Sequence, residues 1–191
     1  MLDAIIELNP EPIARRTVTQ CVLMLTTGLR ISECLALNLE HLAVGGEVGE
    51  WLYLPRYANK CQLMGHTLPL CGYTRETVRR WIDFAKLGDQ PPGTPLFPRL
   101  RQYTHQVLYG TRISGEVTRH LLQRAVAHAR LSGKVTSHGF RKTYAARIYE
   151  LTGKNPLAVK SALRHISLAS TMQYLDDHRQ AAQAAAFNFF D

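Results

Sequence analysis

Two arginines, two histidines and a tyrosine follow one another along this sequence in an order suited to phosphodiester chemistry. Arg30 stands near the start, and His138 and Arg141 lie three positions apart further downstream. His165 and Tyr174 follow, nine positions apart near the end of the chain. An arginine is a planar, always-charged fork that matches two phosphate oxygens, and a phenol is a nucleophile once it is activated. These residue types in this order predict a site that holds a phosphodiester and attacks it.

The chemistry depends on where each group sits. His138 and Arg141 fall at positions i and i+3 of a helix that Ser137 is expected to cap, so both side chains share one face. Backbone N–H groups in the first turn of such a helix also favour an anion. Arg30 and Arg141 would clamp the non-bridging oxygens and offset the charge of a pentacovalent transition state. A tyrosine phenol ordinarily has a pKa of about 10. Tyr174 therefore needs a base or a positive field, which the two histidines are placed to supply.

The elements that would carry these residues are mostly helices. Apolar residues recur at helical spacing over 12–28, where Gly28 predicts the helix end. Alternating apolar residues bounded by turn residues predict two strands, with Lys60 in the connection between them. The other helices are expected from Ser32, from a cap at Thr74 to about Lys86, over 115–130, from a cap at Ser137 to about Leu151, from Asn155-Pro156 and from Ser167, and the strands over 51–55 and 67–70. The predicted fold class is mainly α with a small antiparallel β-sheet (α+β).

Composition places the chain among ordinary folded domains. It has 191 residues, of which 46% are hydrophobic and 20% charged, which suits one domain with an apolar core. No apolar run approaches the roughly 18 residues that a membrane span needs. The first residues also lack the basic start and long apolar stretch of a secretory signal. We therefore expect a cytoplasmic protein with no membrane partner.

The basic charge of the chain favours a polyanionic partner. The formal net charge is +8, and each phosphate that a protein neutralises releases counterions and adds salt-dependent affinity, although charge alone is weak evidence because many cytoplasmic proteins are basic. Clustering is more informative than the total. Six basic residues share the stretch that carries both histidines: Arg141, Lys142, Arg147, Lys154, Lys160 and Arg164. Of these, Lys142 and Arg164 are expected to contact the polyanionic partner.

The four cysteines show no C-x-x-C pair. Cys61, His66 and Cys71 could be imagined as metal ligands, but their spacing is not that of a common zinc site. Idle thiols in a reducing compartment fit better, and lone histidines such as His66 usually cap or pack. No metal site is expected.

Together these segments resemble the catalytic domain of the tyrosine recombinase (phage integrase) family. The matching boxes are Gly28-Leu-Arg30-Ile-Ser-Glu33, His138-Gly-Phe-Arg141-Lys-Thr-Tyr-Ala, and Leu163-Arg-His165 through Tyr174. One box alone, such as H-x-x-R, is a weak signal, whereas all of them in order with the right spacing are a strong one. The resemblance extends from the first helix to about residue 178 and implies the catalytic-domain fold of this family.

The resemblance also implies a role for each residue of the boxes. Tyr174 attacks the scissile phosphate, which gives a 3′-phosphotyrosine link and a free 5′-hydroxyl. Arg30 and Arg141 bind the phosphate. His138 acts as general acid and base, and His165 hydrogen-bonds the phosphate. A 5′-hydroxyl then attacks the link, so bond energy is conserved and neither ATP, metal nor another cofactor is implied.

Three further residues bear on this comparison. Lys60 matches the hairpin lysine that protonates the departing 5′-oxygen in the family, although hairpin lysines are commonly just solvated edge residues. Glu33 matches an acidic position that supports the site, and Arg30 taken alone could equally be its helix-end partner. Arg164 departs from the pattern, because the family usually has glycine before the second histidine.

The resemblance implies a catalytic domain over 1–178 and a tail over 179–191, which packs on its own domain or docks on a neighbouring protomer. The separate N-terminal domain that most members use to clamp DNA has no counterpart, which implies a catalytic fragment or a short stand-alone member. Recombination needs four active sites, which implies a tetramer on two DNA duplexes, assembled from free monomers. Two other functions stay open: DNA relaxation like that of a type IB topoisomerase, and non-catalytic DNA binding.

Overall fold

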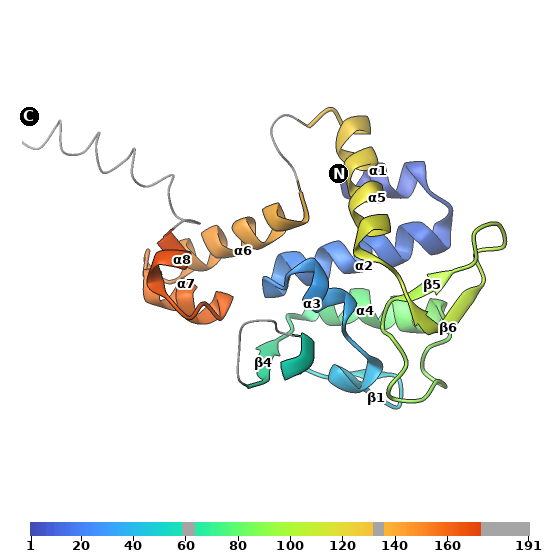
Figure 1. Ribbon diagram of the computed structural model, residues 1–191, viewed down its shortest axis with the longest axis horizontal. Coiled ribbons are helices and arrows are strands. Elements are labelled where there is room, and N and C mark those ends of the chain that lie inside the picture. The colour runs from blue at the N-terminus through green and yellow to red at the C-terminus, as the bar shows by residue number, and fades with distance from the viewer. Residues whose placement is uncertain (59–63, 132–135, 173–191) are drawn as a thin grey trace, which may run out of the picture.

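Helices dominate the structure, with short strands between them (Figure 1). The computed structural model describes residues 1–58, 64–131 and 136–172. Within these ranges the helices are α1 (Leu2–Leu8), α2 (Glu11–Thr27), α3 (Ile31–Leu35), α4 (Gly72–Phe84), α5 (Gly115–His128), α6 (Ser137–Leu151), α7 (Pro156–Leu163) and α8 (Leu168–Met172). The strands are β1 (Ala43–Val44), β2 (Glu47–Val48), β3 (Trp51–Leu54), β4 (His66–Pro69), β5 (Pro98–Leu100) and β6 (Val107–Arg112). The predicted fold class is confirmed. No helix within the described ranges has the length and apolar character of a membrane span.

Helix α2 is the central element, and its sequence explains both of its ends. Pro12 stands in its first turn, where a missing backbone N–H costs little. Gly28 closes the helix in the left-handed conformation, with a φ of 65°. Along the helix, the hydroxyl of Thr17 donates to the carbonyl oxygen of Ile13 at 2.8 Å, so this polar residue is buried without losing a hydrogen bond. The predicted helix over 12–28 is confirmed.

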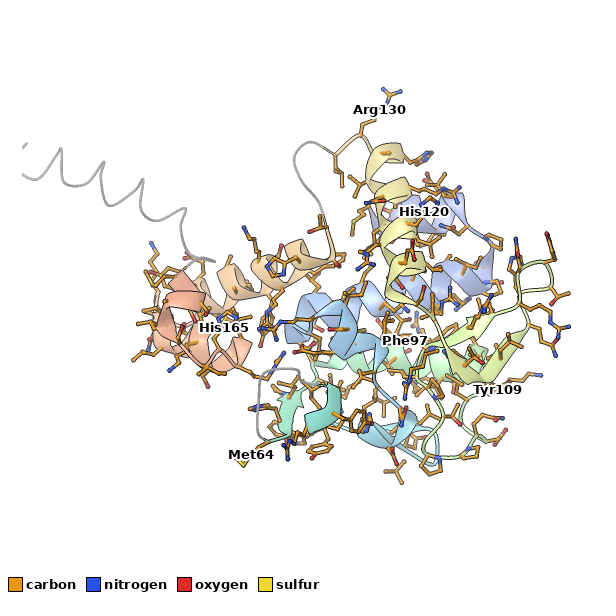
Figure 2. All side chains as sticks on the ribbon, in the orientation of Figure 1. Met64, Phe97, Tyr109, His120, Arg130 and His165 are labelled. Carbon is orange, nitrogen blue, oxygen red and sulfur yellow. The ribbon has the colours of Figure 1, made fainter. Side chains whose placement is uncertain are left out.

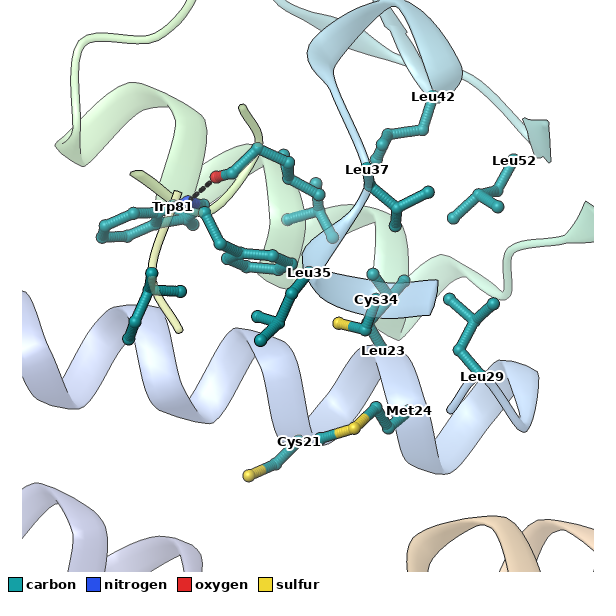
Figure 3. Close-up of a cluster of buried hydrophobic side chains, with 14 of the residues drawn as sticks. Cys21, Leu23, Met24, Leu29, Cys34, Leu35, Leu37, Leu42, Leu52 and Trp81 are labelled. Carbon is teal, nitrogen blue, oxygen red and sulfur yellow. Dashed lines mark hydrogen bonds between the residues drawn. The ribbon is translucent and has the colours of Figure 1, made fainter. Parts of the chain in front are cut away.

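The large apolar core lies where α2, α3 and α4 meet the strands (Figure 3). Leu23, Cys34 and Leu37 belong to it and are fully buried. Trp81 of α4 is its largest side chain, and the indole N–H donates to the carbonyl oxygen of Leu96 at 2.8 Å. Because that polar edge is satisfied, the indole adds apolar area to the core at no hydrogen-bonding cost.

The strands form three separate two-stranded antiparallel sheets rather than one small sheet. In the β3–β4 pair, Leu52 lies opposite Leu68 and Tyr53 opposite Thr67. Leu52 and Leu68 are buried while Tyr53 and Thr67 are exposed, which is the alternation of a sheet with one face on the core. The two strands predicted from the sequence are confirmed as this hairpin.

Two predicted helix starts are shifted. Helix α4 begins at Gly72, because Thr74 is buried and its hydroxyl donates to Thr26 Oγ1 at 2.8 Å instead of capping the helix. Helix α6 begins at Ser137 itself, with Thr136 in the cap position. The sequence prediction did not include helix α1 or the β5–β6 hairpin. Helix α1 is short, and its stability depends on packing against α2 and α5.

Helices α6, α7 and α8 lie together at one end of the molecule, beyond the C-terminal end of α2 (Figure 1). They have a small core of their own, formed by Ala145, Val159 and Leu163. Helix α6 also reaches the large core through Phe140. The predicted site residues that the structure describes fall along the boundary between these two parts of the molecule.

Candidate active site

The junction between α2 and α3 holds Arg30 through Glu33. The backbone N–H of Arg30 donates to Glu33 Oε2 at 2.8 Å, and its Nη1 lies 2.7 Å from Glu33 Oε1. The side chain of Glu33 is 2% exposed, whereas that of Arg30 is 39% exposed. A buried carboxylate therefore holds one edge of a guanidinium that also reaches solvent. This placement is compatible with the supporting role that the family resemblance implies for Glu33.

Arg141 is fully buried where α2, α6 and α7 meet. Its Nη1 donates to the carbonyl oxygen of Gly28, and its Nη2 donates to that of Leu163. Both carbonyls lie at helix C-termini, where backbone oxygens have no partner within their own helix. These bonds account for two of the five N–H groups of an arginine. Arg141 therefore joins the ends of two helices, in addition to any role toward a phosphate.

His165 lies between α7 and α8 (Figure 2). Its Nδ1 is 3.0 Å from the hydroxyl of Thr171, a buried residue of α8. The pKa of His165 is lowered to about 4, first by burial and then by nearby arginine charges. Those charges belong to Arg141, Arg30 and Arg164. The imidazole is therefore neutral near pH 7, and the bond to Thr171 sets its orientation.

His138 stands at the exposed start of α6, one turn before Arg141. Partial burial lowers the pKa of His138, and the charges of Arg141, Lys142 and Arg30 lower it further. Because Arg30 and Arg141 act on both histidines, the four groups share one electrostatic environment. Lys142 is exposed beside them, and its contact with DNA stays a prediction.

Arg164 is not placed as the sequence predicts for a DNA contact. Its side chain is 3% exposed, and its Nη2 lies 3.1 Å from Glu33 Oε2. Its Nη1 lies 3.4 Å from the carbonyl oxygen of Thr27. The guanidinium points inward because the buried carboxylate of Glu33 needs a cationic partner. A DNA contact by Arg164 is therefore not supported by its placement.

Two predicted site residues, Lys60 and Tyr174, lie outside the described residues, as do Cys61 and the tail over 179–191. Strand β4 borders the site at His66, whose pKa is lowered by burial and by the charge of Arg164, while the charge of Glu33 opposes the shift. Among the described residues, no group of three or more histidine, cysteine or acidic side chains could hold a metal ion.

Thr171 is a site residue that the sequence analysis missed. The sequence does place a threonine hydroxyl between the two predicted site residues, three positions before Tyr174 and six after His165. Threonine is too common near helix starts to be singled out without knowing which ring it contacts.

Comparisons with known proteins agree on one family. A model described as the phage integrase family matches residues 1–181. A tyrosine recombinase XerC of Anoxybacillus flavithermus is 26% identical over 173 residues, which cover 85% of this chain and 50% of that protein. Tyrosine recombinase XerC 1 of Ralstonia nicotianae is also 26% identical, over 87% of this chain and 50% of its own length. The chain thus spans about half the length of the curated relatives that it matches.

Solved structures show the same fold. A XerH site-specific recombinase bound to a palindromic difH substrate, in a post-cleavage complex, superposes with a TM-score of 0.72 at 18% identity. That match covers 98% of this chain and 50% of the other. A XerA recombinase gives a TM-score of 0.66 at 16% identity, over 94% of this chain and 62% of that one.

Proposed function

The chain belongs to the phage integrase family, and we propose that it breaks and rejoins DNA strands through a 3′-phosphotyrosine link on Tyr174. The observation that carries this proposal is the convergence of the charges of Arg30 and Arg141 on His138 and His165. A positive site with two neutral imidazoles suits a phosphodiester that gains negative charge as it is attacked. No observation among the described residues favours relaxation or simple binding over this reaction.

In the proposed cycle, the phenol oxygen of Tyr174 bonds to phosphorus, and the bond from phosphorus to the 5′-oxygen breaks. Neutral His138 takes the phenol proton, Lys60 protonates the departing oxygen, and His165 donates a hydrogen bond to a phosphate oxygen. A 5′-hydroxyl then attacks the phosphotyrosine link, which restores a phosphodiester and frees the phenol. The link conserves the energy of the broken bond, so the proposed cycle requires no ATP, and arginines balance the phosphate charge without a metal.

The two arginines would contribute differently. Arg30 has a guanidinium that Glu33 orients and that reaches solvent, so it is the group that a phosphate would meet first. For Arg141, the proposal requires a phosphate contact in addition to, or in exchange for, its bonds to the carbonyl oxygens of Gly28 and Leu163. The positive charge of Arg141 acts on the site whether it keeps these bonds or exchanges them for a phosphate contact.

The proposed partner is double-stranded DNA, bound by a tetramer on paired sites that assembles from monomers in the cytoplasm. The net charge of +8 and the exposed Lys142 beside His138 support a DNA partner. We further propose that residues 1–178 form the catalytic domain and that 179–191 dock on a neighbouring protomer.

The test is a nicked suicide DNA substrate, from which the leaving strand diffuses away and traps any covalent protein–DNA adduct. Tyr174→Phe should abolish the adduct and leave DNA binding largely intact, because only the nucleophilic oxygen is lost. Tyr103→Phe is the matched control, since Tyr103 is 86% exposed on the β5–β6 connection, and it should form adduct like the unchanged protein. An adduct that survives Tyr174→Phe would assign the nucleophile elsewhere, and no adduct from the unchanged protein would reject strand cleavage.

A further inference from the structure

Arg164 occupies a backbone conformation that suits glycine far better than arginine. It closes α7 with a φ of 58° and a ψ of 38°, the left-handed region in which a side chain crowds the following carbonyl oxygen. Its side chain is also buried, and a charged side chain is rarely buried unless it is paired. This position therefore carries both a backbone cost and a desolvation cost, and the contacts of Arg164 must offset them.

The contacts of Arg164 reach from the end of α7 back to the α2–α3 junction. Its Nη2 forms an ion pair with Glu33 Oε2 at 3.1 Å, in which both side chains are almost fully buried. Its Nη1 is shared between the carbonyl oxygens of Thr27 at 3.4 Å and Ala162 at 3.3 Å. One guanidinium thereby connects two segments that are more than a hundred residues apart in the sequence.

Glu33 is held by two arginines at once. Its Oε1 receives the guanidinium of Arg30 at 2.7 Å, and its Oε2 receives both the backbone N–H of Arg30 and the guanidinium of Arg164. Arg164 also directly precedes His165, whose ring faces the same arginine charges. The position of Arg164 thus affects both an arginine and a histidine of the proposed site.

We propose that Arg164 is a positioning residue, which sets the direction of Arg30 through the shared carboxylate of Glu33. This inference rests on the proposed function of the same site. Without Arg164, the carboxylate of Glu33 has lost one of its two cations while remaining buried. Arg30 is then drawn further onto Glu33 and away from the phosphate, or Glu33 takes a proton and releases it.

The test begins with Arg164→Gly, which removes the side chain while giving the left-handed backbone its preferred residue. The cleavage rate on saturating suicide substrate should fall by about 30- to 100-fold, because a misplaced phosphate ligand affects the reacting geometry. The DNA dissociation constant should change by less than about threefold, since the side chain faces Glu33 and not solvent.

Arg130→Gly is the matched control. Arg130 also has a left-handed backbone, with a φ of 49°, but it is exposed after α5 and lies well away from His165 (Figure 2). This variant loses the same side chain from the same conformation and should cleave at the rate of the unchanged protein. An Arg164→Gly rate within about threefold of the Arg130→Gly rate would overturn the proposal.

If Arg164→Gly does not fold, a double variant and its single-variant reference test the same contact. Arg164→Met combined with Glu33→Gln replaces the buried ion pair by neutral side chains of similar size, which buried sites often tolerate. If both residues act on Arg30 through one contact, the double variant should cleave no more slowly than Glu33→Gln alone. Losses that multiply in the double variant would show independent roles and contradict the coupling.

A measurement on the free protein separates this inference from the proposed function. Removing the charge of Arg164 should raise the pKa of His165 above about 4, which NMR titration of the ring can follow without any DNA. An unchanged titration in Arg164→Gly would contradict the proposed placement of His165. If the ring titrates as expected while the unchanged protein forms no adduct, the proposed function fails, and only the placement of the Arg164 charge near His165 is supported.

Discussion

The body formed by α1 to α5 with the hairpins and the end formed by α6 to α8 are held by different forces. The body has a large apolar core centred on α2 and Trp81, whose one polar edge is satisfied. Among the described residues, the end has a core of three buried side chains, and its contacts with the body include Phe140 and two buried arginines, Arg141 and Arg164. Apolar packing depends on area, whereas buried guanidinium contacts depend on distance and direction.

This difference bears on how the site is assembled. The proposed phosphate ligand Arg30 belongs to the body, while His138 and His165 belong to the end. The contacts that place the two halves of the site are therefore also contacts that hold the end to the body. A change in the large core should lower stability without altering the site, and a change at the boundary should alter the site at a smaller cost in stability.

The largest expected effect comes from the core of the body. Trp81→Ala should lower the free energy of unfolding by about 3–5 kcal/mol, because it removes a fully buried indole and its bond to Leu96. Trp51→Ala is the control, since Trp51 is 59% exposed on β3, and it should cost less than about 1 kcal/mol. Urea unfolding followed by circular dichroism measures both. Equal losses in the two variants would mean that the body does not depend on this core.

A smaller effect is expected at the boundary. A Cβ at Gly28 would clash with the ring of Tyr144 on α6. The carbonyl oxygen of Gly28 also accepts a hydrogen bond from Arg141. Gly28→Ala should therefore cost about 1–3 kcal/mol more than Gly45→Ala. Gly45 has a similar φ of 57° and no atom within 4 Å of its Cβ position, so it reports the backbone term alone.

The adduct assay tests whether the packing at Gly28 also positions the site. Gly28→Ala should slow adduct formation at temperatures where the variant is still folded, whereas Gly45→Ala should not. If Gly28→Ala costs stability and leaves adduct formation unchanged, the boundary does not position the site.

The sequence predicted the elements that have local signals. Gly28 marked the end of α2, and Asn155-Pro156 marked the start of α7, where the Asn155 side chain accepts from the N–H of Leu157. These signals act within a few residues, so no tertiary contact is needed to read them. Helix α1 and the β5–β6 hairpin have weaker local signals and depend on packing.

The types and order of the candidate site residues could also be recognised in the sequence, but the burial of these residues could not be predicted from it. Arginine is usually exposed, and nothing local in the sequence shows that carbonyls at the ends of α2 and α7 meet Arg141. The same holds for Arg164, whose partner Glu33 lies 131 positions away in the chain. Such contacts depend on how the helices are brought together, which periodicity does not encode.

The smallest expected effect is a pH dependence that belongs to the end of the molecule. The pKa of His165 is lowered to about 4, below the ordinary histidine value of about 6.5. The unfolded chain therefore binds a proton at this ring that the folded protein does not, between pH 6.5 and pH 4. The contribution to stability is present above pH 6.5 and is lost as the pH falls through this window.

His165→Gln should remove this part of the acid sensitivity. The unfolding free energy of the variant should fall less steeply between pH 6.5 and pH 4 than that of the unchanged protein. Because the ring is partly exposed, solvent screening should keep the difference to the order of 1 kcal/mol. If His165→Gln has the slope of the unchanged protein, burial and the arginine charges do not lower the pKa of this ring in the folded protein.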